Sequence, residues 1–312
     1  MFLAQENARR TLEAGVTTVR DLGAGEGMSF AMRDLINRGA MIGPRMFVCG
    51  NGLSVSRSAP RPGAPMNPGQ ADGPAEVMRA ARQQIASGAD WVKLFGSTGS
   101  GNDVTGNQTF TFEEMKAAVE VTHNLGKRVA IHSYGPAGAR DAVRAGTDSL
   151  EHAVDFDQET LDEMARRKTF YVPTVDHNRY YAEHAREFGY SDTDVENLHA
   201  YMQRNLTAAR RAFQAGVRFA MGSDAVFTMF GENARELEWF VQAGMTPAQA
   251  IHAATRNGAA LLGREDNLGQ IAPGYYADLI AVDGDPLTDI RAVTRQVRWV
   301  MKGGAVVVDK QR

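Results

Sequence analysis

The chain repeats one local pattern, in which a short run of Val, Ile and Phe is followed by an amphipathic helical segment that ends in Ala-Gly. Such alternation is typical of a parallel sheet whose neighbouring strands are joined by crossover helices. One helix is marked at both ends, with Thr111 as its N-cap, Glu114 three residues later and Gly126 as its stop. The apolar runs predict strands over residues 16–23, 45–50, 90–96, 128–135, 147–152, 169–174 and 217–224.

The strand count predicts a barrel. A helical segment opens the chain where a further strand should stand, so we expect an α/β fold of the (β/α)8 TIM-barrel type that lacks its first strand. An open doubly wound sheet is the alternative, and it is disfavoured because no Gly-rich dinucleotide turn follows any predicted strand. We expect the barrel domain to span residues 1–267. Residues 268–312 have strand and turn patterns without helices, which predicts a small C-terminal β appendage.

The overall charge and hydropathy exclude several classes of partner. The 312 residues include 34 basic and 37 acidic side chains, for a net charge of −3, without a block of like charge that would suit nucleic acid. No apolar run reaches the roughly 18 residues needed to cross a membrane. The single Cys49 excludes an internal disulfide. Location in the cytoplasm is the default expectation, and export remains open if a leader lies upstream of residue 1.

Lys93 is an unusual residue for the strand over 90–96, which should be buried. An unpaired ammonium in that environment is costly, and burial would lower its pKa by up to roughly 3–5 units. Carboxylation by CO2 would turn the amine into an anionic carbamate with two oxygen ligands. The ordinary interpretation is a lysine that is ion-paired or that extends towards solvent.

Three more polar residues end predicted strands, namely His132, His152 and Asp224. In parallel barrels the active site lies at the carboxyl ends of the strands. Imidazole and carboxylate groups suit zinc and similar divalent ions. A single strand-end histidine is more often a hydrogen-bonded core residue, so the prediction of a metal site rests on the four residues, with Lys93, occurring at one end of one barrel.

Beyond these residues, nearly the whole chain resembles the amidohydrolase superfamily, in the branch that includes imidazolonepropionases and Xaa-Pro dipeptidases. The most specific stretches are "GENARELEWFVQAGMTPAQAIHAATRNGAALLG" and "APGYYADLIAVDGDPLTDI". Within that branch, "VPTVDHNRYYAEHAREFG" is similar to the carboxypeptidase-type members, including ochratoxin-hydrolysing amidohydrolases.

This resemblance implies a binuclear centre, usually zinc, in which Lys93 is the carboxylated bridge. His132 and His152 would bind one metal ion. Asp224 would bind the other and act as general base towards a metal-activated hydroxide. Tyr134, two residues after His132, would donate a hydrogen bond to the developing oxyanion; the alternative is a packing ring with a solvated hydroxyl.

The chain departs from the family pattern at one point. Members carry a His-x-His pair at the end of the first barrel strand, and none of the seven histidines here forms such a pair. We therefore expect a chain that begins after the first strand, with one metal ion or none in place of two. An inactive fragment is the corresponding alternative function.

Candidate substrate-binding residues follow two of the predicted strands. Arg57 and Arg61 could bind a substrate carboxylate, or simply be solvated. His177, Asn178, Tyr180 and Tyr181 follow a predicted strand at the expected mouth of the barrel. The expected function is hydrolysis of a small amide, such as an N-acyl amino acid, a dipeptide or an ochratoxin-type amide. Cyclic amide hydrolysis or deamination is the alternative within the superfamily, and the resemblance implies a homo-oligomer.

Overall fold

The computed structural model of the chain describes residues 2–56 and 69–310. Each of the predicted strands is present, with bounds shorter than the sequence pattern suggested. The parallel strands are β1 (Thr18–Asp21), β2 (Arg45–Val48), β3 (Trp91–Phe95), β4 (Arg128–Ser133), β5 (Ser149–His152), β6 (Phe170–Val172) and β7 (Arg218–Phe219).

The strands follow one another in space in the same order as in the sequence. β1 pairs with β2, and β3 to β7 form a second parallel ladder. An isolated parallel bridge between Leu53 and Leu94 joins the two parts. Within the described ranges no ladder joins β7 to β1. The α/β class is therefore confirmed, whereas closure into a barrel is not observed.

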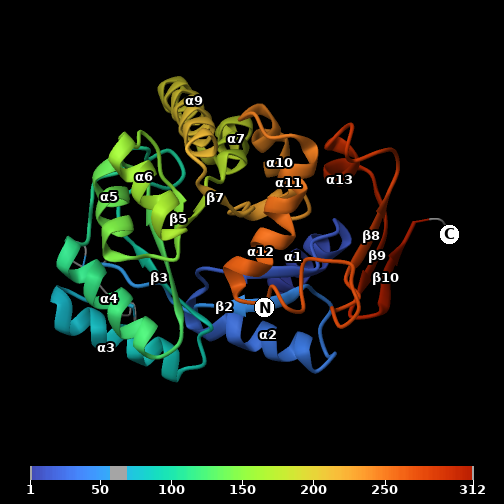
Figure 1. Cartoon of the computed structure of the whole chain (residues 1–312), viewed down its shortest axis with the longest axis horizontal. Helices are drawn as coiled ribbons and strands as arrows, with labels where there is room; N and C mark the ends of the chain where they lie inside the picture. Colours follow the sequence, from blue (N-terminus) through green and yellow to red (C-terminus); the bar gives the residue numbers. More distant parts are fainter. Residues whose placement is uncertain (1, 57–68, 311–312) are drawn as a thin grey trace.

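Helices alternate with these strands and lie around the sheet (Figure 1). They are α1 (Phe2–Glu13), α2 (Met28–Asn37), α3 (Gly73–Ala86), α4 (Phe112–Asn124), α5 (Pro136–Ala145), α6 (Gln158–Arg167), α7 (Val175–Glu183), α8 (Ala185–Phe188), α9 (Asp192–Gln214), α10 (Glu236–Gln242), α11 (Pro247–Ala254), α12 (Arg256–Leu262) and α13 (Arg291–Arg295). The predicted capping box of α4 is present, since the Thr111 amide donates to Glu114 Oε2 at 2.7 Å and the Glu114 amide donates to Thr111 Oγ1.

The two faces of the sheet pack against different surroundings. On β3, Val92 and Leu94 belong to the large core cluster that also contains helical residues such as Met115 of α4. Trp91 belongs to a smaller cluster, with Ala130 of β4. Because side chains alternate along a strand, Lys93 lies on the same face as Trp91 and away from the face covered by the helices. Lys93 is also in register with Ala130.

The C-terminal segment forms a separate antiparallel sheet at one side of the molecule (Figure 1). Its strands are β8 (Leu279–Val282), β9 (Val297–Lys302) and β10 (Ala305–Asp309), in the order β10-β9-β8. Leu12 of α1 packs against Val297 and Val300 of β9. The predicted β appendage is thus confirmed, but the expectation that residues 268–312 contain no helix is wrong, because the short helix α13 lies between β8 and β9 with Ala292 buried. The exact domain boundary stays a prediction. In the part of the chain that the structure describes, no helix combines the length and hydrophobicity needed to cross a membrane.

Candidate active site

The predicted metal-ligating residues occupy neighbouring strands. Lys93 is the third residue of β3, His132 is the fifth of β4, and His152 is the last of β5. Asp224 lies five residues beyond β7. Parallel strands bring their carboxyl ends to one edge of a sheet, so side chains from the end of each strand converge there.

The two histidines lie against each other. The ring centroids of His132 and His152 are 4.6 Å apart, and both side chains are buried. The Tyr134 ring contacts both, at 5.1 Å from His132 and 5.3 Å from His152. His152 Nδ1 forms a 2.5 Å hydrogen bond with Thr174 Oγ1, which holds the orientation of the imidazole.

Burial controls the charge of the basic groups. The pKa of Lys93 is lowered, chiefly by burial, while Glu151 and Asp224 oppose the shift. The pKa of His152 is well below its ordinary value, chiefly because it is buried and then because His132 and Lys93 lie nearby. A neutral imidazole is the form that binds metals, and a neutral amine is the form that can react with CO2.

A second contact joins α7 to the loop after β7. His177 Nδ1 lies 2.7 Å from the backbone carbonyl oxygen of Asp224 and 3.3 Å from the side-chain oxygen Oδ2 of the same residue. His177 Nε2 is buried and has no hydrogen-bond partner among the described residues. The Asp224 side chain is 45% exposed, so its carboxylate is accessible to a small molecule.

Three residues at this edge of the sheet have strained backbones. His152, Thr174 and Asp224 adopt positive φ angles of 72°, 51° and 46°, although none is glycine. Each follows or ends one of the consecutive strands β5, β6 and β7. A non-glycine residue in this region costs of order 1–3 kcal/mol, and such strain concentrates at functional sites.

The Tyr134 side chain lies in a buried aromatic stack beside the histidines. Its ring is buried and stacks on Tyr201 at 4.7 Å. Burial raises the pKa of its hydroxyl, which therefore keeps its proton at neutral pH. The Asn178 side chain approaches this hydroxyl and opposes the rise in pKa, although its Nδ2 makes no full hydrogen bond to any described residue.

The remaining predicted residues have different surroundings. The Tyr180 hydroxyl lies 2.7 Å from Thr228 Oγ1, so it holds a loop in place and is not directed at the histidines. Tyr181 contacts the His177 ring at 5.0 Å. Arg57 and Arg61 lie outside the described residues.

Next to the histidines in the sheet lies an ion pair that the sequence pattern did not predict. Glu151 precedes His152 and is in register with His132. Arg20 of β1 and Glu151 of β5 are 3.0 Å apart; Glu151 is buried and the Arg20 side chain is 9% exposed. Arg20 also donates to Ser149 Oγ at 2.8 Å. The Arg20 guanidinium lies 4.5 Å from the centroid of the Trp91 ring. The position of Glu151 next to His152 in a buried strand was the only sequence signal.

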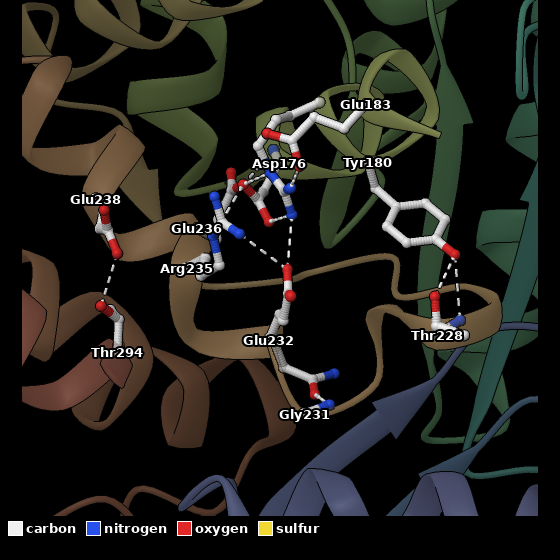
Figure 2. A network of polar contacts seen from close by, with 12 residues as sticks. Asp176, Tyr180, Glu183, Thr228, Gly231, Glu232, Arg235, Glu236, Glu238 and Thr294 are labelled. Carbon is white, nitrogen blue, oxygen red and sulfur yellow. Dashed lines mark hydrogen bonds and ion pairs between the residues drawn. The ribbon is translucent and has the colours of Figure 1, made fainter. Parts of the chain in front are cut away.

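A second missed group holds the N-terminus of α7 (Figure 2). The carboxylate of Glu236 accepts hydrogen bonds from the backbone amides of Val175 and Asp176, at 3.0 and 2.9 Å. Asp176 in turn accepts two hydrogen bonds from Arg179 and one from Trp239 Nε1. These contacts place the turn that carries His177.

The donor set is suited to a metal ion only if Lys93 takes part. No group of three His, Cys, Asp or Glu side chains within residues 2–56 and 69–310 is arranged to hold a metal. His132 and His152 supply two adjacent imidazoles, and the buried Lys93 is a third nearby group, whose carboxylation would add an oxygen ligand. The residues therefore fit a metal ion if Lys93 is carboxylated.

Comparison with known proteins gives the family. The amidohydrolase family model matches residues 2–307. The ochratoxinase of Aspergillus niger is 34% identical over 322 residues, which cover 94% of this chain and 65% of that protein. This chain thus spans less than two thirds of the length of that curated relative.

Solved structures agree with this relationship. A Xaa-Pro dipeptidase with bound methionine in its active site superposes with a TM-score of 0.89 at 35% identity, over 98% of this chain and 79% of that one. The Aspergillus niger ochratoxinase structure superposes with a TM-score of 0.83 at 30% identity, over 98% and 75% of the two chains. The predicted resemblance is confirmed: this chain belongs to the amidohydrolase family.

Proposed function

We propose that this chain carries the active site of a metal-dependent amide hydrolase that acts on small N-acyl amino acids, dipeptides or ochratoxin-type amides. The observation that carries the proposal is the meeting of Lys93, His132 and His152 beside Tyr134, within a fold of the amidohydrolase family. The substrates of the relatives support an amide: one relative is named an ochratoxinase and another a Xaa-Pro dipeptidase.

In this proposal a zinc or similar ion would be held by His132, His152 and a carboxylated Lys93. The ion would supply Lewis acidity, which lowers the pKa of a water molecule from about 15.7 to about 7. The seven histidines include no His-x-His pair, the pair that the family resemblance implies for a second ion, so the proposal is for one ion.

Asp224 acts as the base. Its exposed carboxylate accepts the proton of the attacking water and then delivers that proton to the leaving nitrogen, so that one amide and one water give a carboxylic acid and an amine. The hydrogen bond from His177 to the Asp224 carbonyl holds the strained backbone at this residue.

Tyr134 stabilises the carbonyl oxygen. As the water adds to the amide carbon, negative charge develops on the oxygen, and a protonated tyrosine hydroxyl can donate a hydrogen bond to it. Because burial raises the pKa of Tyr134, the hydroxyl remains a donor over the neutral pH range.

Asp224→Asn tests this assignment, with Asp155→Asn as a matched control. Both aspartates have positive φ angles, 46° and 57°, and similar side-chain exposure, 45% and 43%. We expect Asp224→Asn to lower kcat by about 10²–10⁴-fold, with unchanged metal content and unfolding, while Asp155→Asn retains activity. Equal activity of the two variants would remove Asp224 from the mechanism.

Lys93→Ala tests the ligand assignment independently of turnover. We expect purified Lys93→Ala to lose its bound metal, as measured by elemental analysis, and to recover part of it when a short-chain carboxylic acid is added. Unchanged metal content would contradict a carbamate ligand.

A further inference from the structure

A group of aromatic side chains lies beside the candidate base, and no step of the proposed mechanism uses it. We call Tyr181, Phe188, Tyr190 and Phe227 the rim cluster. Phe188 lies at the centre, with ring centroids 5.1 Å from Tyr181, 5.5 Å from Tyr190 and 5.2 Å from Phe227. The four rings come from α7, from the segment around α8 and from the loop after β7.

Phe227 is held in an unfavourable state. Its side chain is 57% exposed, and its backbone has a φ of 46°, which a bulky residue rarely adopts. The next residue, Thr228, is fixed by the Tyr180 hydroxyl (Figure 2). Arg10 also donates a hydrogen bond to the Thr228 carbonyl. The fold therefore keeps a large apolar ring in water at a position where the backbone is strained, which is expected where the ring has a function.

The rim cluster reaches the candidate active site through two residues. Phe227 is three residues beyond Asp224 in the chain. Tyr181 packs against His177, whose Nδ1 is bonded to the Asp224 carbonyl. Burial raises the pKa of Tyr181 to about 12, so the surface of the cluster is uncharged at neutral pH. An apolar ring bound there would lie next to the carboxylate of Asp224.

We infer that the rim cluster binds the aromatic side chain of the amino acid that is released as the amine. This inference rests on the proposed function, in which Asp224 returns a proton to the leaving nitrogen, so the leaving group lies on the Asp224 side of the amide. Aromatic rings pack edge-to-face or offset at centroid separations of 4.5–7 Å, the range already found within the cluster. A charged or small side chain would leave this surface in water.

Phe227→Ala tests the inference with three substrates: N-acetyl-phenylalanine, N-acetyl-alanine and N-benzoyl-alanine. We expect the variant to lower kcat/KM for N-acetyl-phenylalanine by about tenfold, mainly through KM, and to leave the other two substrates unchanged. Ile271→Ala, at an apolar residue that is 88% exposed, is the matched control and should alter none of the three. An equal effect on all substrates, or a selective loss with N-benzoyl-alanine, would overturn the inference.

A binding measurement separates this inference from the proposed function. Titration calorimetry with L-phenylalanine and L-alanine on the metal-loaded protein needs no turnover. Selective binding of phenylalanine that Phe227→Ala weakens supports the rim cluster, even if no amide is hydrolysed. Hydrolysis with no preference for phenylalanine would support the proposed function and overturn the inference about the rim cluster. A change in the oligomeric mass of Phe227→Ala without loss of selectivity would also overturn that inference, and it would assign Phe227 to a contact between copies of the chain.

Discussion

The carboxylate of Glu236 is predicted to be the main anchor of the turn that carries His177. Glu236 is fully buried and belongs to α10, yet it accepts the first backbone amides of α7, from Val175 and Asp176. The first amides of a helix have no partner within the helix, so a side chain must satisfy them when the helix begins inside a protein. Glu236→Ala removes that partner while leaving both amides buried.

The magnitude follows from the number of amides. Each buried donor left without a partner costs about 1–3 kcal/mol, so two of them give a loss of about 2–6 kcal/mol in the free energy of unfolding. Glu238→Ala is the control, since Glu238 lies two residues later on α10 and bonds Arg295 and Thr294 near the surface. A partly exposed ion pair contributes about 0–1 kcal/mol.

Urea unfolding, followed by tryptophan fluorescence, measures both variants. Trp239 donates to Asp176 in the same turn, so its emission also reports the local structure of α7. We expect Glu236→Ala to unfold at clearly lower urea than Glu238→Ala and to lose activity through misplacement of His177. Each lost partner is expected to cost roughly 1–3 kcal/mol. The anchoring role would therefore be refuted if the free energies of unfolding of the two variants differed by less than about 1 kcal/mol.

Two further predictions concern pH and backbone space. The pKa of His123 is raised, chiefly by its hydrogen bond to Asp148, so the stabilising contribution of this imidazole is complete below about pH 6.5 and is lost as the pH rises through the folded-state pKa. The difference in unfolding free energy between the protein and His123→Gln should therefore shrink from about pH 6 to pH 9. A difference that stays constant over this range would contradict the prediction. Gly106 and Gly126 both have positive φ, but a Cβ at Gly106 would lie 2.5 Å from the backbone nitrogen of Gly135, whereas at Gly126 it would meet nothing within 4 Å. Gly126→Ala should cost about 1–2 kcal/mol in urea unfolding and Gly106→Ala distinctly more, and equal losses would show that the 104–108 loop can move aside.

Much of the fold could be predicted because its signals are local. A strand or a helix cap is defined by residues a few positions apart, such as Thr111 and Glu114, whose side chains and amides satisfy each other within one turn. The same holds for Lys93, His132 and His152, since a polar residue in or after a short apolar run is visible in the sequence. Their meeting at one edge then follows from parallel strand geometry.

The tertiary structure decided everything that depends on contacts between distant segments. Arg20 and Glu151 are 131 residues apart, and Glu236 is 60 and 61 residues from the amides that it holds. Nothing in the local sequence around either partner specifies such a pair, because the pair forms only when two elements that are distant in the sequence pack against each other. The rim cluster is of the same kind, since Phe227 and Phe188 become neighbours only when the loop after β7 packs beside α8.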